Sequence, residues 1–250
     1  ASRLGLLWGG VSTAMSEQRE RQVVVVVGSS PTTRHMAPVG DPGVQLWSLN
    51  DCWQFLSPDH PKDRTLWWEM HEREWFTGPT RPENHLEWLR TCGIPIFMLD
   101  RHEDIPTSLA YPEDQIVADL GCRRYFTSSF SYILAYAAVT LCRGDELHVY
   151  GIDLTLETEY FQQRACAEYW FGRIEGKGVK VVTPKACPLL RGPHYGRPDP
   201  DEAKRLVQTR TLEERLRLLT AEKAMLGAKF NQNQGRIDEA QYLRALLADR

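Results

Sequence analysis

The sequence predicts an α/β protein built on a doubly wound, mostly parallel sheet. Residues 23–27 are five consecutive valines, a run typical of a central strand that is covered on both faces. Further apolar runs are expected as strands, and they alternate with segments of helical pattern: residues 44–49, 65–68, 94–99, 146–150 and 179–182. Each run ends in a polar or glycine-containing turn, as in sheets whose parallel strands are joined through helices.

Two helices are expected in the second half of this sheet region. Residues 130–141 are rich in Ala, Tyr and Leu, and residues 157–172 carry polar and aromatic side chains at helical spacing. Six of the eight tryptophans lie between residues 47 and 88. Because alternate residues of a strand point to opposite faces, Trp67 and Trp68 cannot line one pocket. Trp53 and Trp75 are therefore the better candidates for an aromatic platform beside a ligand.

The composition changes after residue 188. Residues 191–200 are rich in Gly and Pro, as in a linker, and from residue 201 apolar residues recur near helical spacing, with an interruption at residues 231–235. We expect a C-terminal helical hairpin, or one long helix with a break, whose apolar stripe is buried by the body or by a second copy. The expected divisions are residues 1–21 as a disordered segment or extension, 22–195 as the α/β domain and 196–250 as the helical extension.

Composition and charge narrow the class of protein. With 25% charged and 42% hydrophobic residues, the chain has an ordinary globular composition. Residues 200–250 hold 10 Lys and Arg against 8 Asp and Glu, a net charge of +2, which leaves a net charge of −5 for residues 1–199. Because nucleic-acid affinity depends mainly on phosphate contacts, we do not expect nucleic acid as a partner. No stretch approaches the ~20 apolar residues of a membrane span. We expect a cytoplasmic protein, or a virion component if it comes from a phage. Six scattered cysteines without a C-x-x-C pair argue against a metal site.

Polar residues follow several predicted strands at the point where each ends. In parallel sheets these positions meet at one edge, where ligands bind. Gly28, Ser29, Ser30 and Thr32 form a turn of small residues that suits an anion or simply a capped turn. It matches neither G-x-G-x-x-G nor G-x-x-x-x-G-K-[ST]. Further candidates follow the later strands: Asn50, residues 69–71, residues 100–102, and Gly151 with Asp153. Thr127, Ser128 and Ser129 precede a predicted helix, where they would cap it or hold a phosphate.

The order of these motifs is more specific than any one of them. A G-[SN]-[SG]-P turn follows the first strand, Asn50 ends the second, and T-S-[SG]-x-x-x-[IM] at residues 127–133 opens an Ala-rich helix. A Y-G-I-D turn at residues 150–153 and P-x-x-x-x-L-L at residues 184–190 complete the set. Over about residues 22–190 the chain thus resembles the bacterial family 42 sialyltransferases and the sialyltransferase-like proteins of bacteria and phages.

This resemblance implies a Rossmann-like domain that binds a cytidine nucleotide sugar, needs no metal or other cofactor, and transfers the sugar to a hydroxyl acceptor. It implies that Gly28, Ser29 and Ser30 contact the nucleotide phosphate and ribose, and that Asn50 contacts the phosphate or the donor sugar. By the same resemblance, the donor also meets Thr127, Ser128 and Ser129, the nucleotide lies beside Gly151 and Asp153, and Tyr160 steadies the leaving phosphate. From its residue type, Arg164 can pair with a phosphate or with Glu168, four residues further along.

The chain departs from the family at the catalytic base. The family's histidine lies between the G-I-D turn and the last strand, but residues 155–180 contain no histidine. His71, at the end of the third apolar run, is the candidate replacement, poised by Glu69 or Glu72, since imidazole titrates near neutrality. The alternatives are a glutamate as the base, or His71 as a hydrogen-bonded residue of the rim.

Two functions follow from the sequence. The first is a metal-independent glycosyltransferase-like enzyme that uses a nucleotide sugar, with a CMP-type donor favoured. The second is a non-catalytic nucleotide-binding or assembly protein, for example of a phage, that forms homo-oligomers through residues 201–250.

Overall fold

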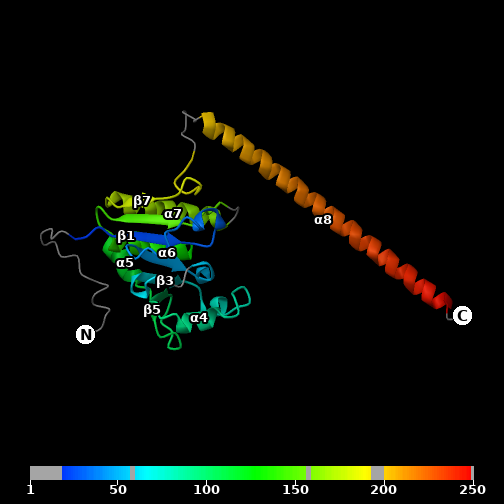
Figure 1. The fold of residues 1–250 in the computed structure, drawn as a ribbon, viewed down its shortest axis with the longest axis horizontal. Coiled ribbons are helices and arrows are strands. Elements are labelled where there is room, and N and C mark those ends of the chain that lie inside the picture. The colour runs from blue at the N-terminus through cyan, green and yellow to red at the C-terminus, as the bar shows by residue number, and fades with distance from the viewer. Residues whose placement is uncertain (1–18, 57–59, 156–158, 193–199, 249–250) are drawn as a thin grey trace. The chain divides into compact units, whose positions relative to one another are not determined.

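The computed structural model describes residues 19–56, 60–155, 159–192 and 200–248. Within them the chain forms a seven-stranded sheet with the order β5-β4-β3-β2-β1-β6-β7, and every strand pair is parallel (Figure 1). The strands are β1 Val23–Val27, β2 Gln45–Leu49, β3 Thr65–Glu69, β4 Ile96–Met98, β5 Ser108–Ala110, β6 Glu146–Tyr150 and β7 Lys180–Val182. The expected Rossmann-like α/β class is confirmed. The strand β5 was not predicted, because its three residues, Ser108–Ala110, form no apolar run.

Helices connect the strands. They are α2 Pro31–Arg34, α3 Arg73–Phe76, α4 His85–Thr91, α5 Glu113–Leu120, α6 Ser129–Thr140 and α7 Glu159–Gly176, with the short 3-10 turns η1 Cys52–Phe55 and η2 Lys62–Arg64. The helix α6 begins at a capping box, in which Ser128 and Ser131 exchange side-chain and backbone hydrogen bonds. Its Ala-rich interior is buried, so the helix can pack closely on the sheet.

The order of the strands places the switch point of the sheet between β1 and β6. From β1 the chain builds the sheet outward through β2 to β5, and after α5 and α6 it returns to β6, which pairs with the other side of β1. In open α/β sheets the crevice at such a point, beyond the carboxyl ends of the strands, is where ligands bind.

The tryptophans divide between the two faces of the sheet, as strand alternation predicts. Trp47 and Trp68 pack with Tyr136 of α6, at ring-centroid distances of 5.5 and 5.7 Å. Trp67 instead contacts Trp88 of α4 at 4.7 Å, on the opposite face. The aromatic cluster of the sequence is therefore mostly core.

Residues 191–250 form a compact unit separate from residues 1–190. In this unit α8, Pro200–Ala248, is one continuous helix (Figure 1). The expected hairpin or break at residues 231–235 is wrong. Gly235 costs about 1 kcal/mol relative to Ala in a helix, but the segment contains no proline, which alone among residues would remove a backbone donor. Among the described helices, none is long and apolar enough to cross a membrane.

Candidate functional site

A cavity of about 1090 Å³ opens at the carboxyl ends of β1, β2, β3 and β6. The structure brings most of the predicted site residues into its wall: Gly28, Ser29, Ser30, Asn50, His71, Thr127, Ser128, Ser129, Gly151 and Asp153. Thr32, Glu69 and Arg164 do not line it. Convergence from separate strand ends, which the sequence predicted, therefore holds for this set.

The turns after β1 and β6 meet at a close backbone contact. Gly28 donates its N–H to the Tyr150 carbonyl oxygen at 2.9 Å, and Ser30 donates to the Gly151 carbonyl oxygen at 2.8 Å. A Cβ on Gly28 would lie 2.6 Å from that Gly151 oxygen. Gly151 has a φ of +66°, and a Cβ there would lie 2.4 Å from the Gly28 oxygen. Both positions thus require glycine, and the two turns are held in fixed relation at the switch point.

Asp153 lies in the cavity wall, and one of its two carboxylate oxygens is buried without a hydrogen-bond partner among the described residues. The Ser30 hydroxyl donates to Asp153 Oδ2 at 2.6 Å. Asp153 Oδ1 is buried and has no hydrogen-bond partner among the described residues. Thr32 stands outside the cavity, where its N–H donates to Ser30 Oγ at 3.3 Å.

Asn50, which also lines the cavity, carries a second unpartnered acceptor. Its backbone is left-handed, with a φ of 51°, a conformation that asparagine tolerates better than most residues. The conformation is held because Asn50 donates its N–H to the Trp68 oxygen and Trp67 Nε1 donates to the Asn50 oxygen, each at 2.9 Å. Asn50 Oδ1 is buried without a partner among the described residues. The two free oxygens of Asn50 and Asp153 call for donor groups, such as hydroxyls, on a ligand.

The N-terminus of α6 forms another part of the wall. Thr127, Ser128, Ser129 and Phe130 all line the cavity. The capping box accounts for the N–H of Ser131, whereas the N–H groups of Ser129 and Phe130, the first two of the helix, have no carbonyl partner within it. Such N–H groups and the helix dipole favour an anion at this end.

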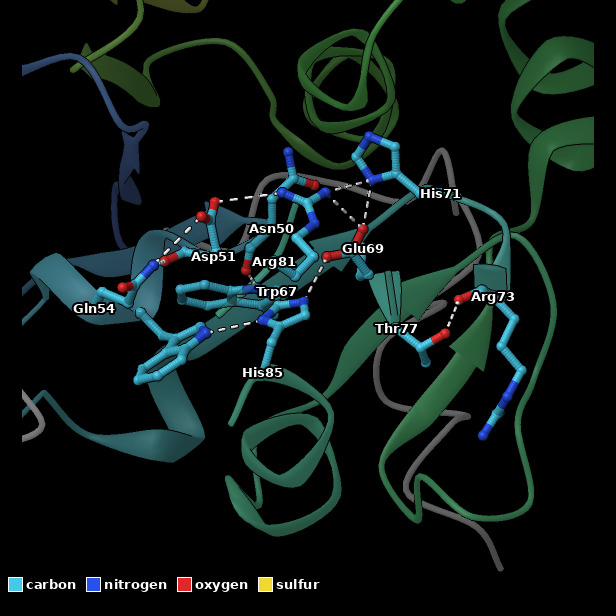
Figure 2. Close-up of polar contacts among 11 residues, drawn as sticks. Asn50, Asp51, Gln54, Trp67, Glu69, His71, Arg73, Thr77, Arg81 and His85 are labelled. Carbon is cyan, nitrogen blue, oxygen red and sulfur yellow. Dashed lines mark hydrogen bonds and ion pairs between the residues drawn. The ribbon is translucent and has the colours of Figure 1, made fainter. Parts of the chain in front are cut away.

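Glu69, at the end of β3, is the centre of a polar network behind the cavity wall (Figure 2). Its side chain is 0% exposed. Its Oε1 lies 2.5 Å from His71 Nδ1, and its Oε2 lies 3.0 Å from His85 Nε2. Burial opposes ionisation, but these hydrogen bonds together with the Arg81 charge outweigh it, so that the pKa of Glu69 lies below 4.5. Glu69 is thus a carboxylate with two accepting oxygens.

The contacts fix the proton of His85 and bear on that of His71. Trp53 Nε1, which can only donate, lies 2.9 Å from His85 Nδ1. His85 therefore accepts at Nδ1 and carries its proton on Nε2, which donates to Glu69. His71 Nδ1 lies 2.5 Å from the other Glu69 oxygen and 2.9 Å from the Arg81 guanidinium, which can only donate. From the shorter contact we infer that Nδ1 donates to Glu69, which leaves Nε2 as the acceptor. Because His71 lines the cavity, this arrangement is that of an oriented general base.

Arg81 closes the network on the cavity side and is one of the functional residues that sequence reasoning missed. Its guanidinium lies 3.5 Å from Glu69 Oε1, 3.4 Å from Asp51 Oδ1 and 2.9 Å from His71 Nδ1. His85, Trp53 and Asp51 were likewise not predicted. Arg81 and His85 lie in a Pro-containing stretch and at the start of α4, where no strand-end pattern marks them.

Two further predicted residues belong to α7. Arg164 donates to Glu168 Oε1 at 2.9 Å and to the Pro188 oxygen at 3.0 Å, so the structure shows the pairing that the sequence offered as the alternative to a phosphate. Tyr160 belongs to the first turn of α7, but its side chain lies outside the described residues.

Aromatic side chains complete the cavity. Trp75 lines it and is 62% exposed, as expected for a rim residue. Phe126 and Tyr132 also line it and stack at a ring-centroid distance of 4.5 Å. Trp53 does not line it, contrary to expectation, because it stacks on Trp88 at 5.6 Å and donates to His85.

Comparisons of this chain with protein-family models, curated proteins and solved structures found no match.

Proposed function

We propose that the cavity binds a nucleotide sugar and that the protein transfers the sugar to a hydroxyl acceptor, with His71 as the base. The observation that carries this proposal is the buried Glu69 carboxylate, hydrogen-bonded to a histidine that faces a cavity of about 1090 Å³. Burying a carboxylate costs stability unless it is fully paired, and such groups concentrate at functional sites. A rim histidine with a purely structural role needs no such partner.

The charge of the cavity favours a donor with one phosphate. Among the described residues that line it, Arg81 is the single Lys or Arg, and Asp51, Glu72 and Asp153 are acidic. Arg81 is already engaged with Asp51 and Glu69. A diphosphate would therefore meet mostly negative charge, whereas one phosphate can be held by the N-terminus of α6. This supports a CMP-type donor, which links the sugar through a single phosphate, as the sialyltransferase resemblance implies.

The proposed transfer balances without a further co-reactant. The acceptor hydroxyl attacks the anomeric carbon of the sugar and gives its proton to His71 Nε2. The bond between the anomeric carbon and the phosphate oxygen breaks, and its electron pair leaves with the nucleotide phosphate. N–H groups of Ser129 and Phe130 stabilise the phosphate charge. Glu69 stabilises the imidazolium that forms. Asn50 and Asp153 accept hydrogen bonds from hydroxyls of the donor.

Calorimetric titration tests the binding step. CMP, UMP, GMP and their sugar conjugates are titrated into the full chain, and we expect binding of CMP compounds that weakens in Asp153→Asn and Ser29→Ala. Thr80→Ala is the matched control, since Thr80 is exposed and outside the cavity wall. If none of these compounds binds, the proposal is refuted.

The catalytic step is tested by release of CMP from a bound CMP-sugar in the presence of a mixture of sugar acceptors. His71→Gln should retain binding and lose release. Binding without any release by the wild-type chain would instead support the second function, a nucleotide-binding protein without catalysis.

A further inference from the structure

The helix α8 exposes a series of large apolar side chains. Six of them are 50–69% exposed: Leu212, Leu216, Leu219, Leu226, Phe230 and Ile237. Side chains of this size cost free energy when they stay in water. A helix of 49 residues with this series therefore calls for a partner surface.

The spacing of these residues identifies the kind of partner. Their steps along the chain are 4, 3, 7, 4 and 7 residues, which a heptad accommodates with Lys223 and Asn233 at the two intervening positions. Leu216, Phe230 and Ile237 then occupy position a, and Leu212, Leu219 and Leu226 occupy position d. A repeat of 3.5 residues keeps one seam facing another helix that supercoils with it. Leu218 and Met225, which are also exposed, lie off this seam at position c. The seam is therefore suited to another helix with the same repeat.

We propose that α8 pairs with α8 of a second copy of this chain as an antiparallel two-stranded coiled coil centred on residue 228. The polar residues of the seam decide the direction. In an antiparallel pair position a meets position d of the other helix, and with this centre Lys223 faces Asn233 of the second copy. Leu226 then meets Phe230, Leu219 meets Ile237 and Leu216 meets Ala240 of the second copy, whereas Leu212 meets Arg244 at the end of the seam. A parallel pair would instead place Lys223 against Lys223 inside the seam.

The charges beside the seam agree with this direction. At the flanking position g, Glu222 of each copy faces Arg236 of the other, which makes two opposite-charge pairs by symmetry. Lys229 meets its own counterpart near the centre, the one like-charge contact among these positions. In a parallel pair Glu222 would face Gly227 and Arg236 would face Gln241, so neither would gain an opposite charge. The antiparallel arrangement thus avoids a lysine–lysine contact in the seam and pairs opposite charges beside it.

Light scattering on the full chain tests the pairing. We expect twice the mass of the 28.7 kDa chain. The double variant Leu219→Asp with Leu226→Asp should return a monomer, whereas Leu218→Asp with Met225→Asp, off the seam but equally exposed, should remain a dimer. Circular dichroism of both variants checks that the α/β domain stays folded. If the wild-type chain is a monomer or a larger oligomer than a dimer, or if both variants lose mass alike, dimerisation through these seam residues is refuted.

Cysteine cross-linking tests the direction. All six native cysteines precede residue 191, so a cross-link within α8 is identified by mass spectrometry of the linked peptide. Lys229→Cys should link to its counterpart, because residue 229 lies at the centre. Leu212→Cys should not, because its two copies stand 32 residues apart along the pair, about 48 Å at 1.5 Å per residue. Linking of Leu212→Cys, or failure of Lys229→Cys to link, refutes the antiparallel arrangement.

Discussion

Replacing Glu69 by Gln keeps the shape of this side chain but changes what it offers to its two histidines. The carboxylate has two accepting oxygens, whereas the amide has one oxygen and one NH2 donor. His85 cannot adapt, because its Nδ1 already accepts from Trp53 and its Nε2–H needs an oxygen. The amide oxygen must therefore face His85 and the NH2 must face His71 Nδ1. His71, which lines the cavity, then accepts at Nδ1 and carries its proton on Nε2.

This reversal of the His71 tautomer has a large expected effect on proton transfer. A ring that carries a proton on Nε2 cannot accept one from a substrate hydroxyl. In serine proteases, the equivalent exchange of a carboxylate for an amide behind the catalytic histidine lowers kcat by about 10⁴-fold through the wrong tautomer. We expect a loss on the order of 10³ to 10⁴-fold in the proposed transfer. The cost in stability should be smaller, about 1–3 kcal/mol, because both hydrogen bonds to the histidines are kept, while their charge assistance and the ion pair with Arg81 are lost.

The tautomer is measured directly, without knowledge of the substrate. Long-range 15N–1H correlation spectra of histidine-labelled protein in mildly alkaline buffer distinguish a ring protonated on Nδ1 from one protonated on Nε2, and His71→Gln assigns the signal. The wild-type ring should be protonated on Nδ1 and the Glu69→Gln ring on Nε2. Glu72→Gln, an exposed neighbour, serves as the control and should leave the tautomer unchanged. If His71 keeps its Nδ1 proton in Glu69→Gln, the proton assignment and the role of Glu69 as its cause are refuted.

Three further predictions follow from the geometry. Gly151→Ala should destabilise the protein by at least about 2 kcal/mol, because a Cβ would sit at φ +66° and 2.4 Å from a backbone oxygen. Gly172→Ala, at a helical position with open space, should instead stabilise it by up to about 1 kcal/mol. Urea unfolding measures both variants, and shifts of the same sign would contradict the close contact at Gly151. Since the pKa of Glu69 is lowered from 4.5, its carboxylate stabilises the fold above that pH. As the pH falls through the folded-state pKa, the free energy of unfolding of the wild-type chain should therefore decrease by up to about 1.4 kcal/mol per pH unit more than that of Glu69→Gln. The same pH dependence of the unfolding free energy in both proteins would refute this. Burial raises the pKa of the Cys52 thiol to about 12, so at pH 8 roughly one molecule in ten thousand carries the thiolate. Iodoacetamide should therefore modify the exposed Cys142 well before Cys52 in the native protein, which peptide mass spectrometry can test.

Much of the site was predictable from the sequence because strand ends in a parallel sheet must share an edge. The valine run at residues 23–27 located the central strand, and the turns at Gly28 and Gly151 then had to meet beside it. The network behind His71 was not predictable in the same way. His85 reaches Glu69 from α4 across 16 residues of chain, and Trp53 reaches His85 from η1 across 32. No local pattern encodes such contacts, since they depend on how the loops fold over the sheet.

By itself, the sequence determined six of the seven strands, their parallel connections and most of the polar residues at one edge, because these follow from local apolar periodicity and from the geometry of strand ends. The tertiary structure alone decided that Glu69 is buried and ionised, that its two oxygens contact His71 and His85, and that Trp53 holds His85 in one tautomer. It also decided that residues 200–248 form one unbroken helix. Proton positions and burial depend on which atoms lie within about 3 Å of one another, and residues distant in the chain meet at that range only in the folded protein.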